Sequence, residues 1–413
     1  MMLLRILLLV GAAGLVTSTG YLLLVMLAAA RFRRGRKVAA CAERAYPPVT
    51  LLKPLCGLEP GLEAHLVSFF EQQYADFEII FGARQADDPG LKLARRISAR
   101  YPSVPVKMVV TGEPWHPNAK VCSLVKMYAR AAHDYLIISD SDVKVGPNYI
   151  ADVVQPLLDP NNGMVTCLYR GLPTGGLWSK LEALGMSVEM TSGALVANLL
   201  EGMKFALGPT MAIRRDALDA VGGFEPLADY CADDYVLGRN VAESGRQVVM
   251  SHHVIDHVVI NRSFLCSMRH QIRWTKSTRY SRHAGHAGTV LTFAMPFGVL
   301  GLLAAGALHH WALGAGMFLA AYLNRAAMAM VSGWGVVGDR RALRSAWLYP
   351  LRDLMGFAFW CASYSSGMIL WRDEWYRLEH GGLMVLAQPS SPIAKAEAKA
   401  DAATPTPVAG GYS

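Results

Sequence analysis

Charged side chains are scarce in this chain, and their scarcity argues against a protein that is soluble throughout. Only 17% of the 413 residues are Asp, Glu, Lys or Arg, whereas 53% are hydrophobic. An average soluble domain has about 25% charged residues. We therefore expect part of the chain to lie in a membrane.

The cysteines lack any regular spacing. Seven of them are scattered along the sequence, without the paired spacing of a zinc site and without the even number of a disulfide framework. Reduced thiols in a domain that faces the cytosol are the simplest interpretation. We therefore expect neither disulfides nor a zinc site.

Arrays of basic residues interleaved with aromatic ones are also missing, which excludes an obvious nucleic-acid-binding surface. The net charge of +8 is modest, and much of the Lys and Arg excess lies beside apolar segments. Basic residues in such places are typical of membrane topology signals and of contact with anionic headgroups. The charge pattern predicts a bilayer as a partner and no nucleic acid.

The first apolar segment, Leu3 to Ala30, is long enough for a transmembrane helix, which needs about 20 residues. Five basic residues follow it directly, in the stretch 31–37. A cleaved signal peptide carries its positive charge first and ends a shorter apolar core in a small-residue cleavage site. Residues 1–31 are therefore predicted to be a retained transmembrane anchor, with the following domain in the cytoplasm.

Residues 45–260 alternate between two kinds of apolar pattern. Four short apolar runs predict strands, and three periodic segments between them predict helices. The strands are expected at 49–52, 77–81, 106–110 and 135–139, and the helices at 62–74, 91–101 and 119–132. Alternation at this spacing predicts an α/β domain with a largely parallel sheet, whose ligands bind at the carboxyl ends of the strands.

Acidic residues stand at two of these strand ends. Asp87 and Asp88 follow the second strand, and Asp140 and Asp142 follow the fourth. Two carboxylates one residue apart suit a divalent cation and a phosphate group, although surface turns also produce many Asp-x-Asp sequences. Because the topology brings both clusters to one edge of the sheet, we interpret them as parts of one site.

The second half of the domain adds another acidic pair. Residues 205–213 are predicted to form a strand with a break at Gly208, which suits a close backbone approach. Asp233 and Asp234 then open a helix that runs to about Ser244. These carboxylates either complement the helix macrodipole or include a general base, and both interpretations stay open.

A basic segment, residues 261–285, follows and contains Arg273 and Trp274. One interpretation is an interfacial helix whose basic residues face lipid headgroups and whose tryptophan anchors it. The other is a site for a diphosphate leaving group, in which the guanidinium neutralises developing charge and the indole closes over the site.

Taken in order, these motifs resemble the ceramide glucosyltransferase family and the related bacterial glycosyltransferases of hopanoid biosynthesis. The resemblance covers roughly residues 45–285. It rests on Lys53-Pro54-Leu55, Asp87-Asp88-Pro89, Asn118-Ala119-Lys120, Asp140-Ser141-Asp142, Ala232-Asp233-Asp234-Tyr235 and the Arg273-Trp274 pair. It implies a nucleotide-diphospho-sugar transferase fold with a Rossmann-like mixed sheet, a UDP-sugar donor, Mg²⁺ or Mn²⁺, and inverting transfer to a lipid hydroxyl at the cytoplasmic membrane face.

The resemblance also implies roles for single residues. Asp88 would contact the uridine portion, and Lys120 would bind substrate. Asp140 and Asp142 would hold the metal ion and the diphosphate. Asp234 would be the catalytic base.

Arg273 and Trp274 would complete the motif usually written Q/R-x-x-R-W and would take part in catalysis. This sequence departs from that motif because its first position is His270, assigned here to substrate binding. A neutral histidine can donate one hydrogen bond but carries no fixed charge. Its contribution to holding a diphosphate is therefore open.

The C-terminal part is again apolar, and residues 286–375 are predicted to form a transmembrane region of two to three helices. Its candidate spans are 290–308, 311–337 and 346–371, the first two joined in a tight hairpin at His309-His310. Asn324 and Arg325 lie within the second of these segments, where polar side chains are energetically costly in lipid. Their presence there has either a structural or a functional reason. Residues 388–413 are expected to be disordered.

The function expected from this pattern is inverting, metal-dependent transfer of a sugar, UDP-glucose being the favoured donor, to the hydroxyl of a ceramide-like membrane lipid. The alternatives are transfer from UDP-N-acetylglucosamine to a hopanoid polyol, a processive polysaccharide synthase, and a membrane protein that only binds a nucleotide. The Met- and Leu-rich helix expected in 177–204 either lines the acceptor site or forms plain core.

Overall fold

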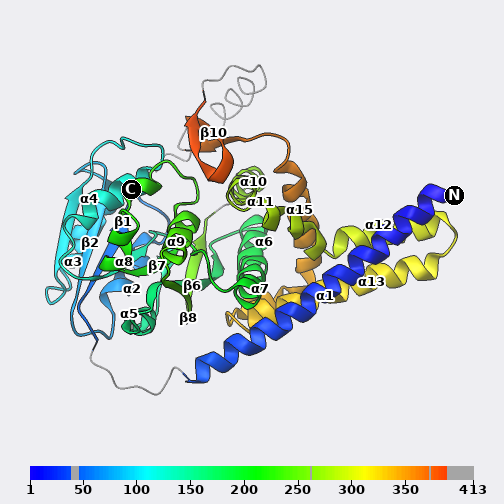
Figure 1. Cartoon of the computed structure of the whole chain (residues 1–413), viewed down its shortest axis with the longest axis horizontal. Coiled ribbons are helices and arrows are strands. Elements are labelled where there is room, and N and C mark those ends of the chain that lie inside the picture. The colour runs from blue at the N-terminus through cyan, green and yellow to red at the C-terminus, as the bar shows by residue number, and fades with distance from the viewer. Residues whose placement is uncertain (39–45, 261–262, 372–373, 388–413) are drawn as a thin grey trace.

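An eight-stranded mixed sheet forms the body of the α/β domain in this computed structural model, which describes residues 1–38, 46–260, 263–371 and 374–387 (Figure 1). In spatial order the strands are β3 (Val106–Val110), β2 (Phe77–Ala83), β1 (Val49–Pro54), β4 (Tyr135–Ser139), β7 (Thr210–Arg214), β6 (Asn162–Pro173), β8 (Gln247–Val259) and β5 (Val143–Lys144). The first four are parallel to one another, and β7 is antiparallel to both of its neighbours. Strand β8 then runs parallel to β6 and antiparallel to β5.

Six short helices belong to this domain. They are α2 (Leu62–Phe70), α3 (Pro89–Ser98), α4 (Ala119–Tyr128), α5 (Tyr149–Val154), α8 (Arg215–Ala220) and α9 (Asp233–Glu243). Two of them begin at side-chain caps that the sequence supplies. Asp88 accepts hydrogen bonds from the amides of Gly90 and Leu91 in α3, and Asn118 accepts one from the amide of Val121 in α4. Strand β2 is buried along its whole length, because its neighbours β1 and β3 and the covering helices leave no face in water.

The α/β fold with a mixed sheet is confirmed, and the four expected strands lie where their apolar runs predicted them. Two details were wrong. The sheet is less parallel than expected, because β7 runs opposite to its neighbours β4 and β6, and β5 runs opposite to β8. The expected strand at 205–213 begins only at Thr210, since the chain up to Pro209 forms the loop that approaches the end of β4.

The helical part of the molecule extends away from the sheet as a bundle of α1 (Met2–Val38), α12 (Met295–Ala307) and α13 (Trp311–Met328) (Figure 1). Small residues allow α1 and α12 to pack closely. A Cβ atom added to Gly14 would lie 2.1 Å from the ring of Phe297, and one added to Gly11 would lie 3.1 Å from the backbone of Gly301. Close packing of small residues is the usual way in which membrane helices associate.

Further helices lie between the bundle and the sheet. They are α6 (Leu177–Gly185), the π-helical turn η3 (Met186–Met190), α7 (Thr191–Glu201), α10 (Phe264–Ser281), α11 (His283–Gly288), α14 (Arg340–Arg344) and α15 (Tyr349–Ala362). Helix α6, η3 and α7 form one continuous rod, as the Met- and Leu-rich pattern predicted. Two thirds of its most apolar window is buried inside the protein, so much of the rod is core.

Two helices among the described residues are long and apolar enough to cross a membrane, namely Met2–Gly35 and Leu177–Glu201. A third appears if His283–Thr292 and Met295–Ala307, which are bent by 48°, are counted as one span. The expected segment at 346–371 is corrected, because α15 has only 14 residues and ends at Ala362. A helix of that length spans about 21 Å, less than the hydrocarbon core of about 30 Å. The tail at 388–413 lies outside the described residues.

A small antiparallel sheet, which the sequence did not lead us to expect, follows α15. Its strands are β9 (Met368–Trp371), β10 (Glu374–Leu378) and β11 (Met384–Leu386). It packs through Ile369, Tyr376 and Leu378 against Cys231 and Tyr280. The sheet therefore joins helix α10 to the loop that leads into helix α9.

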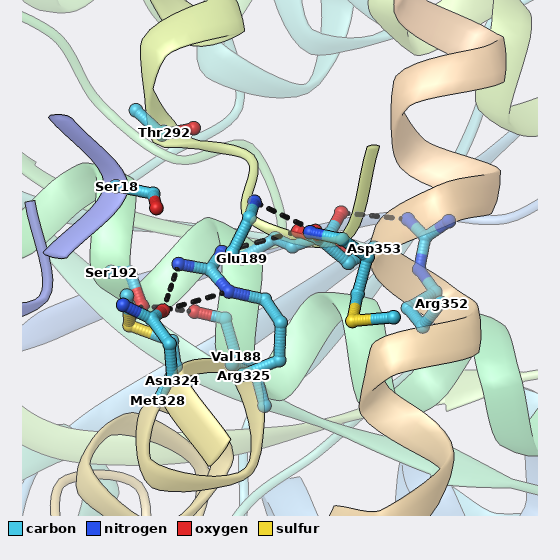
Figure 2. A network of polar contacts seen from close by, with 12 residues as sticks. Ser18, Val188, Glu189, Ser192, Thr292, Asn324, Arg325, Met328, Arg352 and Asp353 are labelled. Atoms are coloured by element: carbon cyan, nitrogen blue, oxygen red, sulfur yellow. Dashed lines mark hydrogen bonds and ion pairs between the residues drawn. The ribbon is translucent and has the colours of Figure 1, made fainter. Parts of the chain in front are cut away.

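Arg325, whose place in an apolar helix was unexplained, is paired with Asp353 of α15 (Figure 2). The Nη1–Oδ1 distance is 3.1 Å, and the side chains are only 3% and 2% exposed. Asn324 Oδ1 accepts from the other guanidinium nitrogens, and Asp353 Oδ2 accepts from the backbone amides of Ala294 and Met295 at the start of α12. This fully hydrogen-bonded pair ties three helices together, so its role is structural.

Replacing Arg325 by Met should destabilise the helical part strongly. The variant leaves the Asp353 carboxylate buried without its counter-charge, which costs about 3–5 kcal/mol. Thermal unfolding of the full chain in detergent measures this loss as a lower melting temperature. The matched change at exposed Arg340 should alter stability by no more than about 0.5 kcal/mol. Equal melting temperatures for both variants would contradict the structural role.

Candidate active site

The turn Asp140-Ser141-Asp142 lies at the end of β4, beside the end of β1. Because these strands are parallel neighbours, Lys53 at the end of β1 reaches the turn and donates from Nζ to the Asp140 carbonyl at 2.6 Å. The lysine is buried, with its ammonium 3.7 Å from the centre of the Phe69 ring. Burial lowers the pKa of Lys53 to about 7, against the opposing attraction of Asp140 and Asp142.

Lys120 joins the first acidic cluster to the second. Its Nζ lies 2.6 Å from Asp140 Oδ1 and 3.9 Å from Asp233 Oδ2. Burial alone would lower the pKa of Lys120, but the two carboxylates outweigh it and raise that pKa. The pKa of Asp140 is raised by burial and by the charge of Asp142, although Lys120 opposes the shift. The expected site residues Lys120 and Asp140 are therefore in direct contact.

Asn118, the cap of α4, holds the second cluster from the same helix end. Its Nδ2 donates to Asp233 Oδ1 at 3.1 Å and to the Tyr230 carbonyl at 2.9 Å, while its Oδ1 caps the helix. The amide is buried, so all of its contacts are made inside the protein. One helix start thus positions both Lys120 and the beginning of α9.

Asp142 pairs with His257 of β8, at 3.0 Å between Oδ2 and Nε2. Burial would raise the pKa of Asp142, but the imidazole outweighs it and lowers that pKa to about 2. The pKa of His257 is raised in return, because Asp142 outweighs the effect of its burial. The other oxygen of Asp142, Oδ1, is buried and has no hydrogen-bond partner within the described part of the chain.

Asp234 stands at the start of α9, against the backbone of Gly208. A Cβ atom added to that glycine would lie 2.9 Å from Asp234 Oδ2, so the close approach expected of Gly208 is made to this carboxylate. Burial and the neighbouring charge of Asp233 raise the pKa of Asp234 to about 6, while Lys120 opposes the shift. The two residues of this pair therefore differ, since Asp233 is held by Asn118 and Asp234 faces the loop before β7.

Arg273 and Trp274 of α10 lie on two sides of this region. The guanidinium of Arg273 is 4.5 Å from the centre of the Trp371 ring on β9, and burial lowers the pKa of Arg273 while Cys231 opposes that shift. The ring of Trp274 lies 6.3 Å from that of His257. The tryptophan is thus next to the Asp142 pair, and the arginine is next to the loop that precedes the Asp233 pair.

His270, the departure from the expected motif, contacts Glu182 of α6. The distance from Nδ1 to Oε1 is 2.6 Å, and Glu182 is almost fully buried and also accepts from Ser267 Oγ. The rings of His270 and Trp274 are 4.3 Å apart. His270 is therefore paired with a buried carboxylate. The assignment of His270 to substrate binding stays a prediction.

The Asp88 carboxylate accepts hydrogen bonds from three backbone amides. It accepts from Gly57 at 2.9 Å, from Gly90 at 2.8 Å and from Leu91 at 3.1 Å. These bonds hold the loop before α2, where Glu59 accepts from the Ser141 hydroxyl at 3.0 Å. Asp88 thus supports the loop beside the Asp140–Asp142 turn, and its assignment to the uridine stays a prediction.

The small sheet β9–β11 and the turn between its strands are hydrogen-bonded to the loop that precedes α9 in the chain. Cys231 donates its amide to the Gly382 carbonyl at 3.0 Å, and Met384 donates to the Asp229 carbonyl at 2.8 Å. On the other side, Lys276 Nζ of α10 donates to the Met368 carbonyl at 2.7 Å. The sheet therefore positions Arg273 and the start of α9 together.

Sequence reasoning did not assign Lys53, Glu59, His257 or Trp371 to the site. Lys53 entered the sequence analysis only as part of the Lys53-Pro54-Leu55 motif, without a role in the site, and His257 did not enter it. The register of β5 with β8, which pairs Val143 with His257, brings the histidine to Asp142. No local signal encodes that contact.

Comparison with known proteins finds relatives that match part of this chain. A ceramide glucosyltransferase of Caenorhabditis elegans is 27% identical over 208 residues, which are 50% of this chain and 44% of that protein. A ceramide glucosyltransferase of Komagataella phaffii is 38% identical over 101 residues, or 24% of this chain and 20% of that protein. The matches thus span half or less of these curated relatives.

Among solved structures, a mannosyltransferase from Pyrobaculum calidifontis in complex with GDP-mannose and Mn²⁺ covers 86% of this chain and 99% of its own, with a TM-score of 0.49 and 18% identity. The family model of glycosyl transferase family 21 matches residues 11–384, which include the mixed sheet, the acidic site and the helical part. The chain therefore belongs to glycosyl transferase family 21.

Proposed function

We propose that this glycosyltransferase transfers a sugar from a UDP-sugar, UDP-glucose being favoured, to the hydroxyl of a ceramide-like membrane lipid with inversion at the anomeric carbon. The proposal is supported by the family and by the names of the curated relatives. The observation that carries it is the second acidic pair. Asp234, with a pKa of about 6, lies beside the network of Asp140, Lys120 and Asp233 at one edge of the sheet.

Asp234 is the proposed general base. A lipid hydroxyl has a pKa far above neutrality, so a carboxylate must accept its proton as the oxygen attacks the sugar. A carboxylate whose pKa is raised toward neutrality is a stronger base and is still ionised at pH 7. One direct displacement inverts the anomeric centre, and no covalent intermediate is needed.

The residues fit a divalent metal ion in part. Asp142 Oδ1 is a buried carboxylate oxygen without a hydrogen-bond partner in the described chain, and carboxylate oxygens are the ligands that hard divalent cations prefer. No three His, Cys, Asp or Glu side chains among the described residues come together as a preformed metal site. Asp142, with Asp140 beside it, would hold Mg²⁺ or Mn²⁺, and the donor diphosphate would supply further oxygen ligands. When bound, the ion would offset the negative charge of the leaving diphosphate.

The cationic side chains around the site have a related role. Arg273 is held by Trp371 on the small sheet, and Lys53 and Lys120 stand behind the Asp140 turn. We assign the arginine to the departing diphosphate, since a guanidinium binds phosphate oxygens through two parallel hydrogen bonds. Trp274 would close over the same region.

The proposed location is a membrane with the α/β domain on the cytoplasmic side. Arg31, Arg33 and Arg34 are exposed near the end of α1, and Gly35 of the same helix packs against His252 on β8. A basic helix end in contact with the sheet supports a position of the domain at the membrane surface, on the side favoured by positive charge. A lipid hydroxyl can then reach the site without leaving the bilayer.

The experiment that tests the function uses purified chain, Mn²⁺ and labelled UDP-glucose, UDP-N-acetylglucosamine or UDP-galactose with ceramide or a hopanoid polyol. We expect a ceramide that carries a single glucose. A polysaccharide would favour a processive synthase, a glycosylated hopanoid would change the acceptor, and no product with any donor would contradict the assignment.

Asp234→Asn should lower kcat by about 10²- to 10⁴-fold, the usual contribution of a general base. The amide keeps the shape of the side chain but cannot accept the proton, so affinity for UDP should change little. Initial-rate kinetics and UDP titration measure the two effects, with exposed Asp76→Asn as the control. Transfer at more than a small fraction of the wild-type rate would disprove the base assignment.

The pH profile should report the same carboxylate. Because Asp234 acts only when ionised, kcat/KM should be level above its pKa of about 6 and should fall tenfold per pH unit below it. Rates measured between pH 4.5 and 8 with the wild type and Asp234→Asn test this. An acid limb that persists unchanged in the variant would assign the titration to another group.

Trp371→Leu should weaken donor binding. The ring holds the Arg273 guanidinium by a cation–π contact, and a contact of this kind contributes about 0.5–2 kcal/mol, so KM for the UDP-sugar should rise roughly 2- to 30-fold. Trp371→Phe keeps an aromatic face and should recover most of the loss, while KM for the lipid should stay constant. A purely structural role would give equal losses for both variants.

A further inference from the structure

Two ion pairs lie next to each other where α13, α15 and the turn η3 meet (Figure 2). The pair of Arg325 and Asp353 has its hydrogen bonds satisfied, as described above. The pair of Arg352 and Glu189 has a single contact, 2.8 Å between Nη2 and Oε2. Arg352 Nε and Nη1 and Glu189 Oε1 are buried and have no hydrogen-bond partner in the described part of the chain.

The incomplete hydrogen bonding of this second pair is energetically unfavourable. The side chain of Arg352 is only 7% exposed, and unpaired donors on a buried guanidinium are strongly unfavourable. An incompletely satisfied charge pair among apolar helices is a marker of function. Glu189 also stands in a π-helical turn, a distortion that is frequent at functional sites.

Glycines on both helices make the space for this pair. A Cβ atom added to Gly185 would lie 2.3 Å from Arg352 Nε, and one added to Gly356 would lie 3.4 Å from Glu189 Oε1. The guanidinium therefore rests on the backbone of α6, and the carboxylate rests over α15. A side chain at Gly185 would displace the guanidinium, whereas one at Gly356 would only touch the carboxylate.

The unpaired atoms define the chemistry of a ligand. Arg352 offers donors and Glu189 offers an acceptor, so a fitting group must both accept and donate hydrogen bonds, and an amide has both capacities. A phosphate is disfavoured, since the Glu189 carboxylate would repel it. The chain neighbours Met190 and Leu351 are 40% and 46% exposed, so both segments that carry the pair also present apolar side chains at the protein surface.

We propose that Glu189 and Arg352 bind the amide group of a membrane lipid. The amide N–H donates to Glu189 Oε1, and the amide carbonyl accepts from Arg352 Nη1. The identification of this lipid as the sugar acceptor rests on the proposed function, whereas the binding site itself rests on the two side chains.

Photo-crosslinking of the full chain in detergent tests the site. The probe is a short-chain ceramide with a photoactivatable group on its acyl chain, competed by octanoyl ceramide or by dioctanoylglycerol, which has ester groups and no amide. The wild type should prefer octanoyl ceramide by about tenfold or more, the effect of a charge-assisted hydrogen bond. Labelled peptides should come from η3 and α15.

Two variants remove the site in different ways. Glu189→Gln abolishes the charged acceptor, and the double variant Glu189→Leu with Arg352→Leu replaces the whole pair by apolar groups, which avoids leaving one charge buried alone. Both should lose the preference for the amide lipid. Glu201→Gln, at the exposed end of the same rod, should keep it. An unchanged preference in both site variants, or labels outside η3 and α15, would overturn the proposal.

A parallel assay of glucose transfer to ceramide separates the two claims. If the wild type transfers no sugar but shows an amide preference that Glu189→Gln removes, the proposed function fails and the lipid site stands. If the wild type transfers sugar and the site variants keep its lipid preference, the site fails and the proposed function stands.

Discussion

The contact of Lys120 with Asp140 and Asp233 is the interaction on which the candidate site depends. It joins two acidic clusters that lie almost a hundred residues apart in the chain, at 2.6 Å and 3.9 Å from one ammonium group. Several carboxylates gathered at one sheet edge repel one another, and the raised pKa values of Asp140 and Asp234 record that repulsion together with burial. Lys120 limits it, because its positive charge opposes the rise in the pKa of both carboxyl groups.

The edge of the sheet was predictable because its signals are local. The apolar run of β4 ends in Asp140, and the acidic pair opens α9, so period-two and helix-start patterns were sufficient to place both. The partners of these residues come from distant segments. His257 reaches Asp142 through the register of β8, and Trp371 reaches Arg273 through a small sheet that follows the last helix. Such contacts depend on tertiary packing, which no local pattern encodes.

In the helical part, too, some features were predictable from the sequence and others depend on tertiary packing. Composition predicted α1 as an apolar helix, but the C-terminal segments are shorter and more bent than their apolar lengths suggested. The question that Arg325 posed has a structural answer, because Asp353, Asn324 and two backbone amides satisfy the pair. The neighbouring pair of Arg352 and Glu189, which the sequence did not mark, is the incompletely satisfied one. The number of hydrogen bonds distinguishes the two pairs, and so does burial, because the Glu189 side chain is 29% exposed whereas the Arg325 and Asp353 side chains are almost fully buried.

The proposed function joins these parts into one reaction. A lipid that enters between the helices would present its hydroxyl at the sheet edge, Asp234 would accept the proton, and the diphosphate would leave toward Arg273. The central claim is a single displacement by the lipid oxygen. The most direct test is the anomeric configuration of the glycolipid formed from UDP-glucose, whose sugar is α-linked, measured by NMR of the purified product. A β-linked product is predicted, and an α-linked product would contradict the account.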